Sequence, residues 1–305
     1  TGTTPGTIYP YHGLFFNVAL LEKHNLENPA KLFNEGQWTW SKFQEYVGTV
    51  SAALDEDETV FAGKPAGLYY GMVNAAGVSL VDPANLRLNF NHKYAVEAAR
   101  IIRNLYETYE NLWGTNAWDE KVDTFVESKT LFAVAEYWFL KTDNRFKKDM
   151  WGEDTRFGYV PFPYPDALDK EDTRVSYQGG AIYQMQSGRE WNYPAGVTAE
   201  DIYRAFTEIF ILTQKNMYED VEFNEEVLMK RAAESKLDDS ESIKAIIFFK
   251  ANNVIWDMFY SIQPSWSHAG PMIDKIVVDG DDYYSVVEEY FNDFNTKMRE
   301  VYGGN

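Results

Sequence analysis

Aromatic rings beside carboxylates and carboxamides are the residues in this sequence best suited to chemistry. Glu136-Tyr137-Trp138 directly follows the apolar run from Leu131 to Ala135, and Tyr177-Gln178 directly precedes Gly179-Gly180. A flat ring can pack on an apolar ligand face, while carboxylates and carboxamides form hydrogen bonds with hydroxyl groups. The pattern therefore fits a ligand that has both apolar faces and polar edges.

Most of the aromatic residues have a simpler explanation. They make up 16% of the chain, which contains 9 Trp and 21 Tyr. Large rings bury much apolar surface, so we expect most of them to lie in the core. Composition alone therefore does not select a binding site.

The sequence carries no motif typical of catalysis. It lacks the nucleophile elbow, the zinc-protease helix motif and the EF-hand calcium loop, and it contains no cysteine. Two carboxylates can hydrolyse a glycoside, but among 47 Asp and Glu residues close pairs arise by chance and none stands out. The four histidines are isolated in the sequence: His12, His24, His92 and His268. We therefore predict no metal and no cofactor, and a glycoside-acting enzyme is the weaker alternative.

Charge and hydropathy limit the partners. The chain has 28 Lys and Arg against 47 Asp and Glu, a net charge of −19, which argues against a nucleic acid partner. No apolar stretch is long enough to span a bilayer. The segment from Thr1 to Thr7 has no signal-peptide pattern, so we expect that such a segment was removed or lies outside this piece.

The stretch from Tyr9 to Tyr46 predicts a strand, a helix, a loop and a second helix. Gly13 to Phe16 is a short apolar run, and Val18 to His24 favours a helix. Asn28-Pro29 is expected to break this helical pattern and begin a loop, because the residue before proline avoids helical geometry. Thr39 or Ser41 can cap a following helix. Its inward face would contain Phe43, Tyr46, Val47 and Val50.

Hydrophobic periodicity predicts further elements along the chain. Ser51 to Ala66 is expected to be a solvated loop, and Gly67 to Val73 fits either a strand or a helix. The predicted strands are Leu131 to Ala135, Thr155 to Phe162 and Val175 to Met185. The predicted helices are His92 to Tyr109, Asp119 to Ser128, a segment that begins at Thr198, Asn224 to Leu237, Asp239 to Phe259 and Tyr283 to Tyr302.

Three consecutive motifs resemble the family-1 extracellular solute-binding proteins of sugar ABC importers. The motifs are Tyr11 to Asn17, Leu20 to Leu26 and Trp38 to Phe43. They match the family's Y-G-x-x-Y-N strand, its L-L-x-x-x-G-L helix and its W-T-W-x-x-F helix start. His12, Phe16 and Val18 depart from the family's usual residues without breaking the pattern. The glycine pair at 179–180 resembles the family's second hinge crossing.

The resemblance implies an α/β fold of the type II periplasmic-binding-protein (Venus-flytrap) kind. It divides the chain into a hinge crossing at 1–14, a C-terminal lobe at 15–176, a second crossing with N-lobe helices at 177–262, and a return to the C-terminal lobe at 263–305. In that family the first crossing follows the strands that build the N-terminal lobe's sheet; in the given sequence no such run stands before the crossing, so the chain resembles the C-terminal two-thirds of a family member. Helices from Thr198 to Phe259 should then expose apolar faces, which predicts a partner: a separate N-terminal fragment or a second chain.

The resemblance also implies ligand-binding residues. Trp138 would stack on a sugar ring, with Glu136 accepting hydrogen bonds from hydroxyl groups. Tyr11 and His12 would lie at one hinge crossing and Tyr177 and Gln178 at the other, while Trp266 would lie where the chain returns past the cleft. A packing role remains open for each of these residues. The family uses the equivalents of Trp38 and Trp40 for packing, so these two are left out of the site.

The function implied is capture of a carbohydrate, an oligosaccharide, outside the cell. The protein would be periplasmic or a cell-surface lipoprotein and would deliver its ligand to the membrane subunits of an ABC permease. The main alternative is a non-transport interaction module built on part of a binding-protein scaffold.

Overall fold

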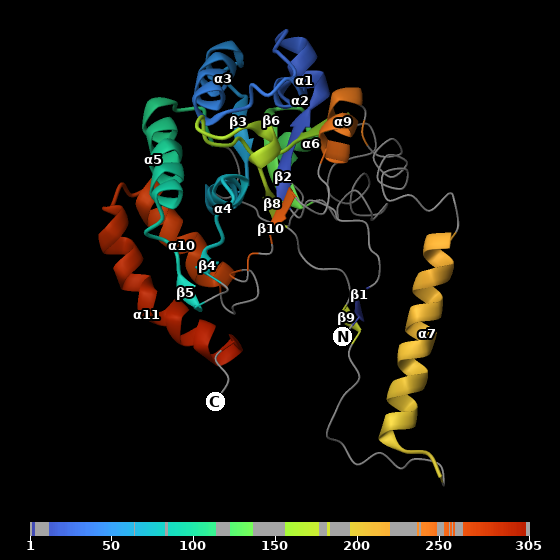
Figure 1. Ribbon diagram of the computed structural model, residues 1–305. Helices are drawn as coiled ribbons and strands as arrows, with labels where there is room; N and C mark the ends of the chain where they lie inside the picture. The colour runs from blue at the N-terminus through green and yellow to red at the C-terminus, as the bar shows by residue number, and fades with distance from the viewer. Residues whose placement is uncertain are drawn as a thin grey trace.

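The structure is a computed structural model. It describes residues 2–3, 12–63, 65–82, 85–113, 123–136, 156–176, 182–183, 196–219, 237, 239–248, 253–255, 257, 259 and 265–302. Figure 1 shows a central sheet, helices packed around it, and one long helix, α7, that stands apart.

The central sheet has four strands in the order β3-β6-β2-β7. These strands are β3 (Thr59–Ala62), β6 (Thr130–Glu136), β2 (His12–Asn17) and β7 (Phe157–Val160). Strand β3 pairs parallel with β6, whereas β2 is antiparallel to both β6 and β7. Strands β3, β6 and β7 therefore end at the edge of the sheet where β2 begins, which we call the carboxyl edge.

Both faces of the sheet are covered. All six residues of β2 are buried, and Leu14, Phe15 and Phe16 are at most 1% exposed. A strand that is covered on both sides needs a continuous apolar run and not an alternating one. This explains why Gly13 to Phe16 contains no polar side chain.

The two outer strands of the sheet are also covered by other segments. Next to β3, the backbone N–H of Val60 donates to Asn111 O at 3.0 Å and that of Phe61 donates to Leu112 O at 2.8 Å. Next to β7, the N–H of Tyr159 donates to Ser242 Oγ at 2.8 Å, from helix α9 (Ser240–Phe248). This pairing satisfies backbone groups that an open sheet edge would leave to solvent.

Three helices follow β2 and gather at the end of the sheet opposite the carboxyl edge (Figure 1). They are α1 (Val18–Lys23), α2 (Pro29–Asn34) and α3 (Trp40–Ala53). Of the two predicted caps, Thr39 and Ser41, the structure selects Thr39, whose side chain accepts the N–H of Lys42. Phe43 and Val47 are fully buried, as predicted.

The predicted break at Asn28-Pro29 is confirmed, since α1 ends at Lys23 and the backbone of Asn28 is extended, but the loop predicted to follow it was wrong, because helix α2 begins at Pro29. Asn28 Oδ1 accepts the N–H groups of Ala30 and Lys31, and Pro29 occupies the first turn of α2. Proline is favourable at this position, where its missing N–H would have no helical partner. The dipeptide therefore begins a helix that the sequence analysis did not predict.

The predicted solvated loop from Ser51 to Ala66 was also wrong, since it contains β3. Val60, Phe61 and Ala62 are fully buried, and Glu58 is only 3% exposed. The neighbouring acidic residues favoured a prediction of loop. The strand is buried because it pairs with β6, and this pairing leaves no local sequence pattern.

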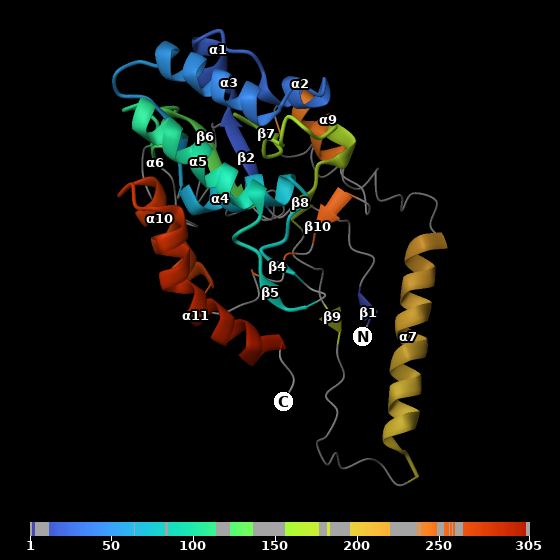
Figure 2. The same ribbon diagram turned by 60° about the vertical axis from the view of Figure 1, so that its left-hand side comes forward.

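Four helices pack together beside and below the sheet, as Figure 2 shows from a second direction. They are α4 (Pro65–Ala75), α5 (Lys93–Thr108), α10 (Ser265–Val277) and α11 (Tyr283–Tyr302). The helices predicted at His92 to Tyr109 and Tyr283 to Tyr302 are confirmed. Every residue of α4 is buried, which resolves the ambiguous Gly67 to Val73 segment as helix.

The remaining elements are short. Helix α6 (Asp123–Val126) confirms part of the predicted Asp119 to Ser128 helix, with Phe125 fully buried. Strands β4 (Val81–Asp82) and β5 (Arg87–Leu88) form a hairpin. Strand β8 (Val175–Ser176) pairs parallel with β10 (Val254–Ile255). Strand β1 (Gly2–Thr3) pairs antiparallel with β9 (Ile182–Tyr183).

Helix α9 differs from its prediction in length and in neighbours. The expected helix from Asp239 to Phe259 ends at Phe248, and β10 lies within the same stretch. Although α9 falls in the 177–262 segment, it packs against α2 and β7; Asn28 Nδ2, for example, donates to Asp239 Oδ1 at 2.8 Å. The division of the chain into lobes otherwise stays a prediction.

Helix α7 (Ala199–Glu219) begins where the sequence predicted. Thr198 Oγ1 accepts the N–H of Asp201 at 3.2 Å, and Asp201 Oδ2 accepts the N–H of Thr198 at 2.9 Å. Figures 1 and 2 both show α7 apart from the sheet and the helices that cover it. The predicted Asn224 to Leu237 helix lies outside the described residues except for Leu237.

Candidate functional site at the carboxyl edge of the sheet

The carboxyl edge is where this topology favours a ligand. In open α/β sheets, ligands bind outside the carboxyl ends of the strands, because the following loops meet there. At this edge His12, at the start of β2, is the register partner of Glu136, at the end of β6. The structure therefore brings together two of the predicted site residues from segments 124 positions apart.

His12 contributes a neutral and buried imidazole. The residue is 2% exposed, and burial lowers the pKa of its ring to about 3. The next residue, Gly13, lies directly against Tyr159, whose ring would be 2.0 Å from a Cβ at that position. Because His12 is buried, a ligand would reach its ring only after neighbouring side chains moved.

Gly63 makes the turn that follows β3 at the same edge. Its φ is +92°, and a Cβ at this position would lie 3.3 Å from Val134 O on β6. A side chain is therefore disfavoured both by the backbone conformation and by the close approach of β6. Helix α4 begins two residues later, so its first turn also starts at the carboxyl edge.

Trp113 is a site candidate that the sequence analysis missed. Its indole N–H donates to Gly63 O, and its ring centroid lies 5.1 Å from that of Phe61, tilted by 31°. The residue is partly exposed. In the sequence it follows the long 93–108 helix outside any apolar period, and no motif marked it; only its pairing with β3 reveals its position.

The other predicted site residues are not placed by the structure. Tyr11, Trp138, Tyr177 and Gln178 lie outside the described residues, although Tyr11 adjoins His12 and Trp138 follows Glu136 by two positions. Of Glu136 the structure describes the backbone, and Trp266 lies in the first turn of α10 with its side chain outside the described part.

The two tryptophans that were left out of the site do pack the fold. Trp38 is fully buried and donates its indole N–H to Pro161 O at 2.9 Å. Trp40 is 3% exposed and donates to Pro163 O at 2.9 Å. Both tie the start of α3 to the proline-rich segment after β7.

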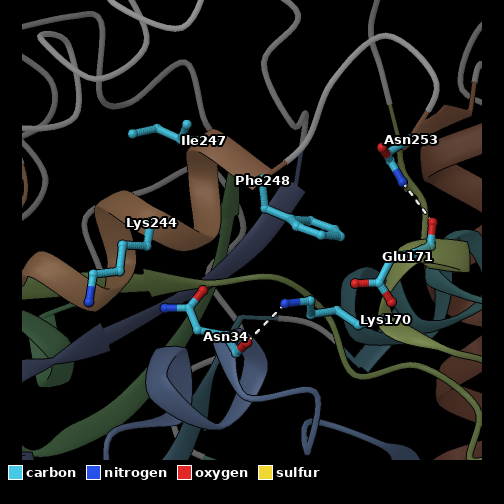
Figure 3. A pocket seen from close by; sticks show the side chains of 7 residues that line it. All are labelled: Asn34, Lys170, Glu171, Lys244, Ile247, Phe248 and Asn253. Atoms are coloured by element: carbon cyan, nitrogen blue, oxygen red, sulfur yellow. Dashed lines mark hydrogen bonds between the residues drawn. The ribbon is translucent and has the colours of Figure 1, made fainter.

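A cavity of about 580 Å³ lies elsewhere, between α2, α9 and the turn at Lys170–Asp172 (Figure 3). Its lining includes Phe248 and several polar groups that bond within the protein. Lys170 Nζ donates to Asn34 O at 2.9 Å and lies 4.9 Å from the Phe248 ring, and Asn253 Nδ2 donates to Glu171 O at 2.9 Å. These bonds join the elements around the cavity, so we assign it a structural role.

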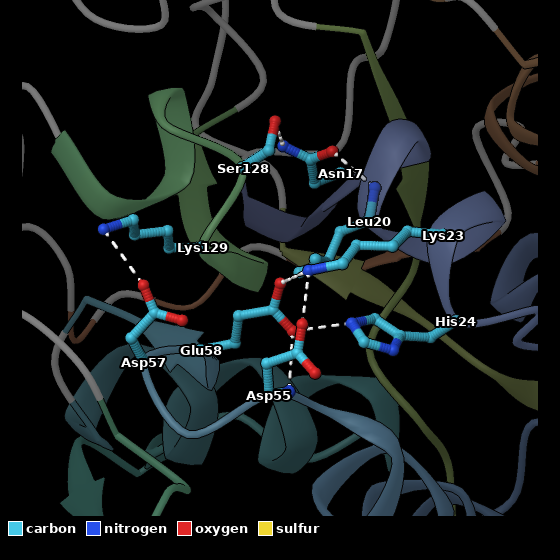
Figure 4. A network of polar contacts seen from close by, with 9 residues as sticks. All are labelled: Asn17, Leu20, Lys23, His24, Asp55, Asp57, Glu58, Ser128 and Lys129. Carbon is cyan, nitrogen blue, oxygen red and sulfur yellow. Dashed lines mark hydrogen bonds and ion pairs between the residues drawn. The ribbon is translucent and has the colours of Figure 1, made fainter.

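A charged cluster joins the end of α1 to the loop before β3 (Figure 4). Lys23 Nζ lies 2.6 Å from both Asp55 Oδ2 and Glu58 Oε1, and His24 Nε2 lies 2.6 Å from Glu58 Oε2. Burial raises the pKa of Glu58, but hydrogen bonds from Lys23, the Asp55 N–H and His24 outweigh it, so the net pKa is lowered. His24, Asp55 and Glu58 are close enough to share a cation, and the Lys23 ammonium already supplies that charge.

A second buried carboxylate belongs to the packing of α4. Asp257 is 1% exposed and accepts hydrogen bonds from Asn74 Nδ2 at 2.8 Å and from the Leu80 N–H at 3.0 Å, and also from Ser79 and the Phe259 N–H. Burial raises its pKa, and these hydrogen bonds act in the opposite direction. With four donors arranged around it, Asp257 connects loops and is not exposed to a ligand.

No protein-family model and no curated protein sequence matches the chain. Solved structures do match it. UgpB from Mycobacterium tuberculosis, in complex with glycerophosphocholine, is 14% identical over 98% of this chain and 71% of that one, with a TM-score of 0.58. The sugar-binding protein MalE from Xanthomonas citri is 12% identical over 98% and 72%, with a TM-score of 0.59. The GacH receptor of Streptomyces glaucescens, solved with acarbose, is 16% identical over 98% and 71%, with a TM-score of 0.52.

These likenesses extend over nearly the whole chain and confirm the predicted fold class. Over the described residues, no helix has the length and apolar character needed to cross a bilayer. The chain has the α/β fold of the type II periplasmic-binding proteins.

Proposed function

We propose that this protein binds an oligosaccharide outside the cell and delivers it to the membrane subunits of an ABC permease. The observation that carries the proposal is the fold, shared over 98% of the chain with a sugar-binding protein and with a receptor solved with acarbose. The carboxyl edge supports it, since polar and aromatic residues meet there at the end of paired strands. The protein would act as a periplasmic component or as a lipid-anchored one.

The proposed mechanism is closure of two lobes around the ligand. A ligand that contacts both lobes only in the closed form shifts the population toward that form. The β8–β10 pair supports a crossing near residue 177, because β8 ends there beside a strand from a distant part of the chain. We propose that the protein binds its ligand without catalysing a reaction on it. The structural neighbours are described as binding proteins and a receptor.

Binding can be tested with a defined panel: maltotriose, acarbose, D-tagatose, blood group A trisaccharide and glycerophosphocholine. We expect at least one sugar to give a saturable calorimetric titration and to raise the unfolding temperature. At a hundredfold excess over Kd the stabilisation should be about 2.7 kcal/mol. Chromatography should recover the sugar unchanged. Cleavage of the sugar would support the enzyme alternative, and no binding to any sugar would contradict the proposal.

Trp138 is the residue that we propose to stack on the sugar, with Glu136, Tyr11, Tyr177, Gln178 and Trp266 as further contacts. If the ring stacks, Trp138→Ala should weaken sugar affinity at least tenfold, about 1.4 kcal/mol. Titration calorimetry measures this, with Trp138→Phe as the variant that keeps an aromatic ring. Unchanged affinity in Trp138→Ala would remove this residue from the site.

We also propose that α7 packs against a further polypeptide segment, on a longer chain or on a second one. Tyr203, Ile209 and Leu212 are 56%, 64% and 57% exposed, which is unusual for three large apolar residues on one helix. The structural neighbours extend beyond the stretch that matches, since this chain covers 71–73% of UgpB, MalE and the Bacillus subtilis protein MsmE.

Intact mass under denaturing conditions and sedimentation under native conditions test this partner. A second polypeptide in the sample, a chain heavier than 35.2 kDa, or self-association would support it. A monomer of 35.2 kDa with no second polypeptide would contradict it and favour an interaction module with an open face.

A further inference from the structure

We infer that Trp113 is a ligand-stacking residue of the carboxyl edge, and that the ligand offers it the flat C–H face of a pyranose ring. The inference rests on the proposed function and deepens it, because it assigns a contact residue and the part of the sugar that this residue recognises.

The backbone places Trp113 at the carboxyl edge. The segment 111–113 runs beside β3, with the N–H of Phe61 donating to Leu112 O at 2.8 Å and a parallel bridge between Phe61 and Trp113. Because this segment is parallel to β3, it reaches the carboxyl edge together with β3, β6 and β7. Trp113 is thus the residue at which a fourth parallel segment arrives at that edge.

Two contacts hold the indole in place. Its N–H donates to Gly63 O at the turn after β3, and its ring packs on Phe61 at a centroid distance of 5.1 Å. Phe61 is itself fully buried and stacked on Phe132, 5.5 Å away and 21° from parallel. A ring fixed in this way loses little conformational entropy when a ligand binds, which favours affinity.

Exposure separates Trp113 from the packing tryptophans. Trp38 and Trp40 also donate their indole N–H groups to backbone carbonyls, but they are 0% and 3% exposed. Trp113 has the same kind of anchor and is partly exposed. An anchored and partly exposed tryptophan at the expected binding edge is suited to act as a platform.

The anchor also defines the ligand chemistry. With its N–H bonded to Gly63 O, the indole recognises a ligand through its ring surface and not through hydrogen bonding. A pyranose presents such an apolar face through its C–H groups. A quaternary ammonium would also bind an indole, and glycerophosphocholine tests that alternative.

The test combines affinity with a local spectroscopic signal. Protein labelled with 5-fluorotryptophan is titrated with the panel sugar that binds, and the ¹⁹F resonance of Trp113 is identified by its loss in Trp113→Phe. We expect that resonance to shift with saturation by the sugar. Trp113→Ala should weaken binding at least tenfold, and Trp113→Phe should weaken it less. Tyr284→Ala, which removes a 56% exposed aromatic residue of α11, should leave the affinity unchanged.

The outcomes separate this inference from the proposed function. Sugar binding by the parent protein, with unchanged affinity in Trp113→Ala and no shift of the Trp113 resonance, overturns the stacking role and leaves sugar binding intact. Binding of glycerophosphocholine but of no sugar overturns the pyranose assignment together with the proposed sugar-binding function. Absence of binding to every compound overturns the proposed function and this inference together.

Discussion

Helices α5 and α7 have the same kind of sequence and different surroundings. Both are long and amphipathic, with 16 and 21 residues. In α5 the apolar stripe is buried, and Ala98 and Ile102 are fully inaccessible. In α7 the apolar residues Ile209 and Leu212 are 64% and 57% exposed. The comparison shows that a hydrophobic stripe predicts a helix and a face to be covered, but not what covers it.

Alanine substitutions on the two helices should give the largest difference in the free energy of unfolding. Ile102→Ala in α5 should lower the free energy of unfolding by about 2–5 kcal/mol, because it leaves a cavity in a packed core. Ile209→Ala in α7 should change it by less than about 0.5 kcal/mol, as for an exposed residue. Urea denaturation of the isolated protein measures both. An equal loss in both variants would show that α7 is already covered in solution.

His12 should make the stability of the sheet depend on pH. Its pKa falls from an ordinary 6.5 to about 3 in the fold, so between these values the unfolded chain binds the proton and the native protein does not. The stability is therefore fully present above pH 6.5 and declines as the pH falls toward 3, by up to several kcal/mol. Denaturation curves at several pH values measure the slope.

His12→Gln is the control for that slope, since it keeps a polar side chain that does not titrate. Its stability should change less with pH between 6.5 and 4.5, where most carboxylates are still ionised. An unchanged slope in His12→Gln would assign the pH dependence to other groups. If the unfolding of α7 is followed separately by spectroscopic signals local to that helix, its stability should not depend on pH in this way. Helix α7 lies apart from the sheet in Figure 1.

Glu58→Gln should lower the free energy of unfolding by an intermediate amount, which again distinguishes the packed part of the protein from α7. The substitution removes the buried charge that binds Lys23 and His24 at the C-terminal end of α1 and should cost about 2 kcal/mol. Since the pKa of Glu58 is lowered in the fold, its contribution is present above pH 4.5 and is lost as the pH falls below it. Glu208→Gln on exposed α7 is the matched control and should be nearly neutral. Equal costs would contradict a special role for the cluster.

The smallest expected effects concern the helix caps. Thr39→Ala removes the cap of the packed helix α3 and should lower global stability by about 1 kcal/mol. Thr198→Ala removes the corresponding bond at α7 and should reduce helix content without a measurable change in global unfolding. Circular dichroism and urea denaturation distinguish the two results. A global loss in Thr198→Ala would mean that α7 unfolds together with the sheet.

The sequence by itself determined the elements whose signals are local. The apolar period of α5, the cap at Thr39 and the Thr198–Asp201 pair each lie within a few residues of the structure that they specify, so they could be identified without the fold. The motif resemblance added the fold class, which the comparison with solved structures confirmed.

Only the tertiary structure decided the features that depend on distant partners. Strand β3 lies among acidic residues and is buried because β6 and the 111–113 segment pair with it. The same pairing carries Trp113 to the carboxyl edge, and strand register brings His12 opposite Glu136. Backbone hydrogen bonds between strands join any residues in register, whatever their separation in sequence, and therefore no local pattern could have revealed these contacts.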